Sequence, residues 1–176
     1  MDFEMPTPLM RQYLFDHLLL NRVHQIDALE LCALLPDQSV DMILADLPYG
    51  TTACSWDTVI PFVPMWEAFK RVIKPRGAIV LFAGQPFTSL LIASNVEMFK
   101  YTLVWEKSVA ANFFNAKNKP LSLHEDVCVF SLGTTANGSQ RQMNYYPQGL
   151  TKVRYPMESP QKVPDRTWFR SSIPYA

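Results

Sequence analysis

The stretch "VDMILADLPYG" (residues 40–50) decides the fold of this chain. It begins with an apolar run of strand length, and a carboxylate, a proline and a tyrosine follow within four positions. Ligands of open α/β sheets bind beyond the carboxyl ends of the strands, so Asp46, Pro48 and Tyr49 stand where chemistry is expected. The same residue types also shape ordinary turns, which leaves a purely structural role open at this point.

Short apolar runs alternate with helix-like segments around this stretch. Strands are predicted at 40–46, 77–83, 101–107 and 125–131. Helices are predicted at 27–35, between 61 and 77, and at 86–95. The second helix rests on the helical spacing of Trp66, Phe69, Val72 and Ile73, with Pro75 and Gly77 as its stop. This order predicts an α/β fold with a mostly parallel sheet, right-handed crossovers and helices on both faces.

Composition favours one globular domain without a strongly charged surface. The 176 residues are 48% hydrophobic, which is enough for one sizeable core. Lys+Arg and Asp+Glu number 16 each, so nucleic-acid binding would need a local basic patch. No signal peptide and no run of roughly 20 apolar residues is visible, which predicts a cytoplasmic protein. The widely spaced Cys32, Cys54 and Cys128 indicate neither a disulfide framework nor a metal site.

The residues 46–49 suit one particular chemistry. The exocyclic amine of a nucleobase is a poor nucleophile because its lone pair is delocalised into the ring. Acceptors such as the Asp46 carboxylate and the Leu47 carbonyl would hydrogen-bond its N–H groups and stabilise the charge that develops as it attacks a methyl group. Pro48 fixes the turn and donates no N–H, and Tyr49 offers a face for a flipped base.

Four segments resemble a known family. "VDMILADLPYG" resembles the Asp/Asn/Ser-Pro-Pro-Tyr/Phe motif of DNA amino-methyltransferases, with Leu47 as a departure at the second position. Residues 26–50 resemble the opening of the subgroup in which this motif comes first in the chain. Residues 66–91 resemble its next helix, strand and loop, and residues 101–131 resemble its following strand, basic loop and "HE" segment. The resemblance implies a partial Rossmann-like methyltransferase sheet.

The resemblance implies S-adenosylmethionine as the cofactor and double-stranded DNA as the substrate. Members of the family modify adenine N6 or cytosine N4, and Asp46 favours adenine. It gives the catalytic role to Asp46, Leu47, Pro48 and Tyr49. It places Asp27 and Asp46 near the cofactor, although Ile26 stands where the family usually has glycine. On the substrate side it implies Tyr49, Trp56, Lys107, Asn115, Lys117, Lys119 and His124, with no proton transfer by His124.

One part of the family pattern is missing. Its Phe-x-Gly-x-Gly cofactor loop follows the recognition region, and residues 132–176 contain no such segment. The chain therefore looks C-terminally truncated, with an N-terminal extension (1–22), the catalytic half of a methyltransferase domain (23–131), and a partial recognition region or poorly ordered tail (132–176). A homodimer or a complementing chain with the cofactor half is an expected partner, and a restriction-modification or prophage setting is implied.

Two other functions remain open from the sequence. One is a DNA-binding protein without catalytic activity, which holds nucleic acid through the basic loop and through cations of the tail: Arg141, Lys152, Arg154, Lys162, Arg166 and Arg170. The other is an α/β interaction protein with no nucleic-acid role, which the zero net charge favours.

Overall fold

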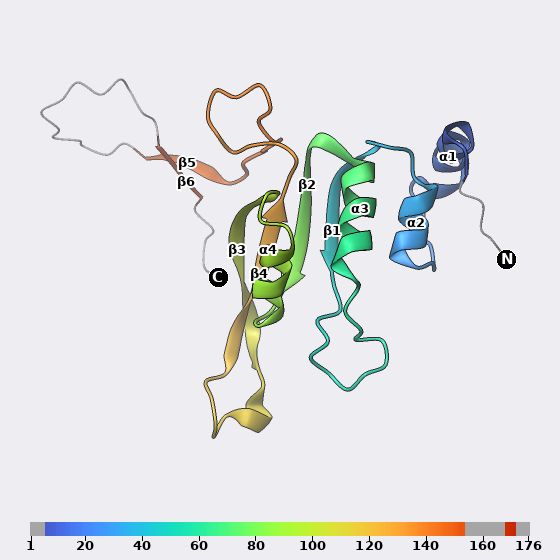
Figure 1. Ribbon diagram of the computed structural model, residues 1–176. Helices are drawn as coiled ribbons and strands as arrows, with labels where there is room; N and C mark the ends of the chain where they lie inside the picture. Colours follow the sequence, from blue (N-terminus) through green and yellow to red (C-terminus); the bar gives the residue numbers. More distant parts are fainter. Residues whose placement is uncertain (1–5, 154–167, 172–176) are drawn as a thin grey trace, which may run out of the picture. The chain divides into compact units, whose positions relative to one another are not determined.

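The computed structural model describes residues 6–153 and 168–171, in two compact units, Met1–Asn144 and Tyr145–Ala176 (Figure 1). Each unit is considered by itself. The first contains α1 (Pro8–Leu14), the π-helix η1 (Phe15–Leu19), α2 (Ala28–Leu34), β1 (Val40–Asp46), α3 (Phe62–Val72), β2 (Ile73–Ala83), α4 (Phe87–Ser94), β3 (Phe99–Ala111), the 3₁₀-helix η2 (Phe113–Asn115) and β4 (Ser122–Phe130).

The first unit is built on a four-stranded sheet with the strand order β1-β2-β4-β3. β1 pairs with β2 in parallel, whereas β4 is antiparallel to both β2 and β3. Three of the four strands therefore run in one direction, and the predicted α/β class is confirmed. The sheet is mostly parallel in strand direction only, because β4 lies between β2 and β3 and leaves a single parallel pairing.

One face of the sheet carries the core. Side chains alternate along a strand, and Ile79 and Leu81 of β2 point to the face on which both are fully buried. α3 and α4 lie against this face (Figure 1). They contribute Met65, Trp66, Phe69, Val72, Phe87 and Leu91 to the same cluster of buried side chains.

The opposite face of the sheet is largely uncovered by described residues. Met42 and Leu44 of β1 and Leu103 and Trp105 of β3 are each more than half exposed. The prediction of helices on both faces is therefore wrong for the part of the chain that the structure describes, because α2, α3 and α4 send their buried side chains into one cluster. β1 is also an edge strand of this sheet, with β2 as its one neighbour in it.

The boundary between α3 and β2 differs from the predicted one. The helix ends at Val72, and Ile73 begins the strand and pairs with Val40. A residue before proline is disfavoured in the helical conformation, so Pro75 pulls the chain into an extended form from Lys74. Ile73 is fully buried by its place in the strand, although its spacing also fitted the helix.

The hairpin of β3 and β4 extends beyond the end of β2. The last pair that β2 makes with β4 is Ala83 with Asp126, whereas β3 and β4 continue to pair as far as Ala111 with Ser122. Both strands are longer than predicted because they support each other there without a third strand. The projecting hairpin is the yellow segment of Figure 1, and η2 lies at its tip.

The second unit contains an antiparallel pair, β5 (Leu150–Val153) and β6 (Trp168–Ser171), in which Leu150 is opposite Ser171. Three cations proposed for the tail, Arg154, Lys162 and Arg166, lie outside the described residues. Among the helices of residues 6–153, none combines the length and the apolar character that a bilayer span requires.

Candidate functional site

The turn after β1 carries the four residues with the predicted catalytic role. Asp46 ends the strand with an exposed side chain, and Tyr49 donates a hydrogen bond of 2.8 Å from its hydroxyl to Asp46 Oδ1. Leu47 turns inward and is 8% exposed, so its side chain belongs to the core and only its backbone can serve a ligand. The structure thus holds a carboxylate and a tyrosine together at the carboxyl end of β1.

Tyr49 is positioned by α4. Its ring stacks on Phe87, with 5.1 Å between the ring centroids and an interplanar angle of 23°. The next residue, Thr88, donates a hydrogen bond of 2.8 Å to Asp126 Oδ2 of β4, which ties the start of α4 to the sheet. One face of the tyrosine ring is therefore occupied by the protein.

The hydroxyl of Tyr49 remains a donor at neutral pH. Burial raises the pKa of Tyr49 above its usual value, and the hydrogen bond to Asp46 raises the pKa further. Asp46 Oδ2 accepts no hydrogen bond from another described residue, so it is free to accept one from a ligand. The turn therefore offers one carboxylate oxygen that is already fixed and one that is available.

The loop after this turn is organised by Asp57. Its carboxylate accepts hydrogen bonds from the backbone N–H groups of Gly50, Thr51 and Thr52 at 2.9, 2.9 and 2.7 Å. A hydrogen bond from the Thr52 side chain and then those from the backbone lower the pKa of Asp57 to about 2. Gly50 has a φ of +67°, a conformation that favours glycine. Asp57 thereby fixes the backbone of residues 50–52, which follow Tyr49.

We expect this loop to open on acidification. The folded state lowers the pKa of Asp57 from 3.8 to about 2, so its stabilising effect is present above pH 3.8 and is lost as the pH falls toward 2. NMR of the Gly50, Thr51 and Thr52 amides during an acid titration should show a midpoint near 2. In Asp57→Asn these amides should lack that transition and exchange faster with solvent. A midpoint at 3.8 in the unmodified chain would show that the hydrogen bonds do not favour the carboxylate.

Two cavities of the first unit have volumes of about 570 and 700 Å³, and the larger one lies at the carboxyl ends of β2 and β3 and the start of β4. Five of the seven residues predicted on the substrate side line this larger cavity: Tyr49, Lys107, Asn115, Lys119 and His124. They come from the β1 turn, from β3 and β4, and from the tip of the hairpin. The structure therefore brings together residues that are distant in the chain, such as Tyr49 and His124, which are 75 positions apart.

The cavity carries both charged and neutral polar groups. Lys107 forms an ion pair with Glu125 on the neighbouring strand, so the charge of this lysine is neutralised. Lys119 forms no ion pair with another residue in the described part of the chain. Asn112 donates a hydrogen bond of 3.1 Å to Ser122 across the hairpin. The lining thus holds two cations, Lys107 and Lys119, and two carboxylates, Glu125 and Asp126, among mostly polar residues.

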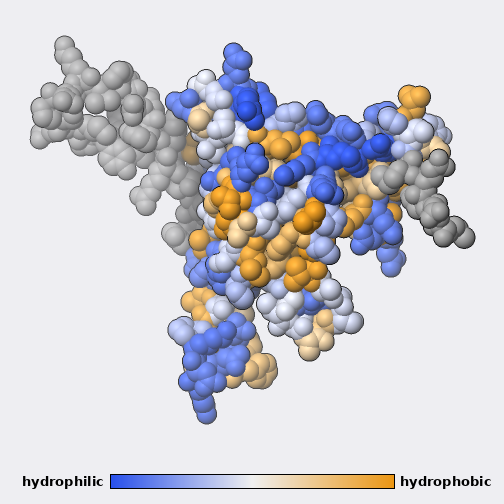
Figure 2. All heavy atoms as spheres, in the orientation of Figure 1, coloured by the Kyte–Doolittle hydropathy of each residue, from blue (hydrophilic) through white to orange (hydrophobic). Residues whose placement is uncertain are grey.

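Two predicted substrate residues lie outside this cavity. Trp56 is 72% exposed in the loop that Asp57 closes, and Lys117 is exposed at the tip of the hairpin. Figure 2 shows hydrophilic and apolar residues side by side at this tip, which also exposes Phe113 and Phe114. The tip therefore offers cations and aromatic faces together, the combination that nucleic-acid surfaces use.

Asp27, predicted near the cofactor, begins α2. Its Oδ1 accepts hydrogen bonds from the backbone N–H groups of Leu29 and Glu30 at 2.8 and 3.2 Å, which makes it the N-cap of this helix. It does not line the cavity that contains Tyr49. The described residues thus give this carboxylate a structural task.

The solved structures similar to this chain include the following two. They are crystal structures of M1.HpyAVI, one of them as a complex with SAM. The complex is 16% identical over 61% of this chain and 55% of that chain, with a TM-score of 0.40, and the other is 17% identical over 61% and 52%, with a TM-score of 0.39. The match spans about half the length of those chains. No family model matches the sequence.

Sequence reasoning did not predict the contacts that three residues make in the site. Asp57 acts on amides five to seven positions before it, and no local motif marks this arrangement. Phe87 was predicted as an ordinary helix residue, and its stacking on Tyr49 depends on how α4 packs. Glu125 of β4 forms an ion pair with Lys107 of β3, a contact that depends on how the two strands pair.

Proposed function

We propose that this chain is the base-binding, catalytic part of a DNA methyltransferase that moves a methyl group from S-adenosylmethionine to the exocyclic amine of adenine. The observation that supports this most is the cavity of about 700 Å³, which is lined by side chains of the hairpin and by Tyr49, whose hydroxyl is hydrogen-bonded to Asp46. An open polar cavity at the carboxyl ends of strands is a typical ligand site in α/β proteins.

Asp46 has the central role in this proposal. A flipped adenine would donate one N–H of its amine to Asp46 Oδ2 and the other to the Leu47 carbonyl. Both are acceptors, so they favour the positive charge that develops on the nitrogen as it attacks a methyl group. Tyr49 fixes Asp46 through its hydroxyl, and the ring face that is not packed on Phe87 is proposed to stack on the base.

The hairpin has the DNA-binding role. Lys119, Lys117 and Asn115 lie on one connection between β3 and β4, close to exposed aromatic rings. Cations and amides of this kind contact phosphates and position a protein on the duplex without reading its sequence. We propose that the tip holds the DNA backbone while the target base enters the cavity beside Tyr49.

S-adenosylmethionine supplies an electrophilic methyl group when bound. The described residues fit only part of a site for it, because Asp27 and Asp46, the two carboxylates that the resemblance places near it, do not line the cavity beside Tyr49. We propose that a second chain completes this site, either another copy or a chain that carries the glycine loop. The uncovered face with Met42 and Leu44 and the edge strand β1 support such a partner.

The test is methyl transfer to DNA. The purified chain is incubated with S-adenosylmethionine labelled in its methyl group and with an adenine-containing duplex, over a series of protein concentrations. We expect label in N6-methyladenine after digestion to nucleosides, rising more than linearly with protein concentration if a second copy completes the site. The absence of label at every concentration, with or without candidate partner chains, would contradict the proposal.

A DNA-binding protein without methyl transfer is the second candidate. The incomplete donor site favours it. In that case the duplex binds with an affinity that falls steeply with salt and does not change when S-adenosylmethionine is added. The same samples therefore distinguish the two candidates.

A further inference from the structure

The second cavity of the first unit, of about 570 Å³, lies at the opposite end of β3 and β4 from the proposed catalytic site. Lys100 lines it near the start of β3, whereas Lys107 lines the cavity beside Tyr49. Seven residues of strand separate the two lysines, which corresponds to about 23 Å at a rise of about 3.3 Å per residue. The two cavities are therefore separate.

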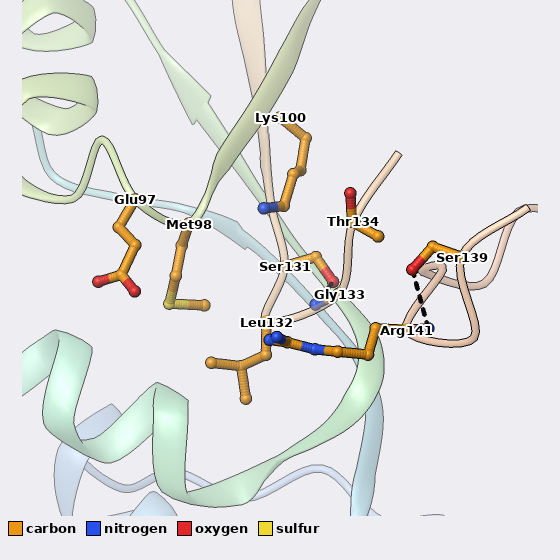
Figure 3. A pocket seen from close by; sticks show the side chains of 9 residues that line it. All are labelled: Glu97, Met98, Lys100, Ser131, Leu132, Gly133, Thr134, Ser139 and Arg141. Atoms are coloured by element: carbon orange, nitrogen blue, oxygen red, sulfur yellow. Dashed lines mark hydrogen bonds between the residues drawn. The ribbon is translucent and has the colours of Figure 1, made fainter. Parts of the chain in front are cut away.

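Two cations face this second cavity. Figure 3 shows Lys100 extending from β3 and Arg141 extending from the loop after β4, both toward the space beside Met98 and Leu132. Neither cation forms an ion pair with another residue that the structure describes. Glu97 is the one acidic side chain in the lining, and it has no ion-pair partner either within the described part. The lining therefore has a net positive charge.

The loop that carries Arg141 is firmly held. The Ser131 hydroxyl, 1% exposed, donates to the Gly77 carbonyl at 2.6 Å and accepts from the Gly133 N–H at 3.0 Å. Thr134 donates its N–H to the Arg141 carbonyl at 2.9 Å. A Cβ at Gly133 would lie 2.9 Å from the Arg141 carbonyl oxygen, so the two arms of the loop approach closely. The backbone of Arg141 is thus fixed before any ligand binds, which lowers the entropic cost of binding.

Two hydroxyls complete the lining. Thr134 Oγ1 accepts a hydrogen bond from the Ala136 N–H, and Ser139 Oγ accepts one from the Arg141 N–H, at 3.1 Å each. Both oxygens act as acceptors toward the backbone, so their O–H groups remain available as donors. Two cations and two hydroxyl donors around one space are the set that binds phosphate oxygens through charge-assisted hydrogen bonds.

We propose that this cavity binds a phosphate group, held by Lys100 and Arg141 with hydrogen bonds from Thr134 and Ser139. The phosphate belongs either to a free phosphate-bearing molecule or to the backbone of a bound nucleic acid. Glu97 weakens the site because its carboxylate repels the anion. The site is independent of the proposed methyl transfer, since it shares no lining residue with the cavity beside Tyr49.

Four variants test this site: Lys100→Gln, Arg141→Gln, Glu97→Gln and, as the control, Lys70→Gln. Lys70 is an exposed cation of α3 that forms no ion pair with described residues. Calorimetry measures the affinity for inorganic phosphate, which represents a free ligand. Fluorescence anisotropy at several salt concentrations measures the affinity for a short duplex, which presents backbone phosphates. We expect binding to weaken about tenfold or more in the first two variants, because each loses a hydrogen bond to a charged group. Glu97→Gln should bind more tightly.

The two arms identify the source of the phosphate. A free ligand is indicated if the first two variants change only the affinity for inorganic phosphate. A backbone phosphate is indicated if each of them lowers the salt slope of duplex binding by about 0.9. The proposal is overturned if both variants match Lys70→Gln in both arms, or if Glu97→Gln weakens binding. Methyl transfer plays no part in these measurements, so they stand whether or not the chain is a methyltransferase.

Discussion

Asp46→Asn should lower methyl transfer to adenine by about 100-fold or more while duplex binding stays nearly unchanged. The substitution keeps the shape of the side chain and removes the charge that stabilises the amine as it attacks. It leaves in place the hairpin cations Lys107 and Lys119, which line the cavity. The measurement is the rate of label transfer into N6-methyladenine at saturating DNA, beside the dissociation constant from anisotropy.

Tyr49 supplies the matched controls for this experiment. Tyr49→Phe loses the hydroxyl that donates to Asp46 but keeps the ring on Phe87, so it should retain much more activity than Tyr49→Ala. Full activity in Asp46→Asn would remove the carboxylate from the mechanism. Equal losses in the two Tyr49 variants would show that the hydroxyl, and not the ring face, is what the reaction needs.

Phe130→Ala should destabilise the fold by about 3–5 kcal/mol, because it removes a large side chain from a packed core. Phe130 is fully buried at the end of β4, with its ring centroid 4.8 Å from that of Trp66 and 5.7 Å from that of Phe99. It thus joins α3, β3 and β4. The measurement is the free energy of unfolding from urea titration.

Phe114→Ala is the control for this substitution. Phe114 is 96% exposed at the hairpin tip, so its removal should change the free energy of unfolding by no more than about 0.5 kcal/mol. Equal effects of the two substitutions would mean that the core is not centred on β4. If Phe114→Ala instead weakens duplex binding at unchanged stability, the tip has the nucleic-acid role proposed for it.

Much of the fold follows from local sequence. The run at 40–46 is apolar and ends at a turn, and β1 has those bounds. The sequence predicts helices where α2, α3 and α4 lie, and for α3 the prediction rests on apolar residues that recur at helical spacing. Ile73 was assigned to the helix because spacing alone does not tell the last helical residue from the first residue of a buried strand. Which face the helices cover depends on packing between distant segments, and no local pattern encodes it.

Some residues of the candidate site can likewise be predicted from the sequence, and others cannot. Residues 46–49 could be selected because they follow a strand and share one chemistry, and of these four residues Tyr49 lines the larger cavity. Lys107, Lys119 and His124 were selected through a resemblance, and the hairpin register brings them to that cavity. The hydrogen bonds of Asp57 to the amides of residues 50–52 could not be predicted, since no local sequence pattern marks them. Whether the selected residues act as proposed is decided by the experiments above.

The length of the hairpin has a consequence for how such a site can change over time. β2 ends at Ala83, so one wall of the cavity is built into the sheet, while the other is carried by two strands alone. Mutations or insertions at the tip can therefore alter which ligand the chain binds without disturbing Asp46 or the hydrophobic core. Selectivity and chemistry are thus free to diverge separately within one small domain.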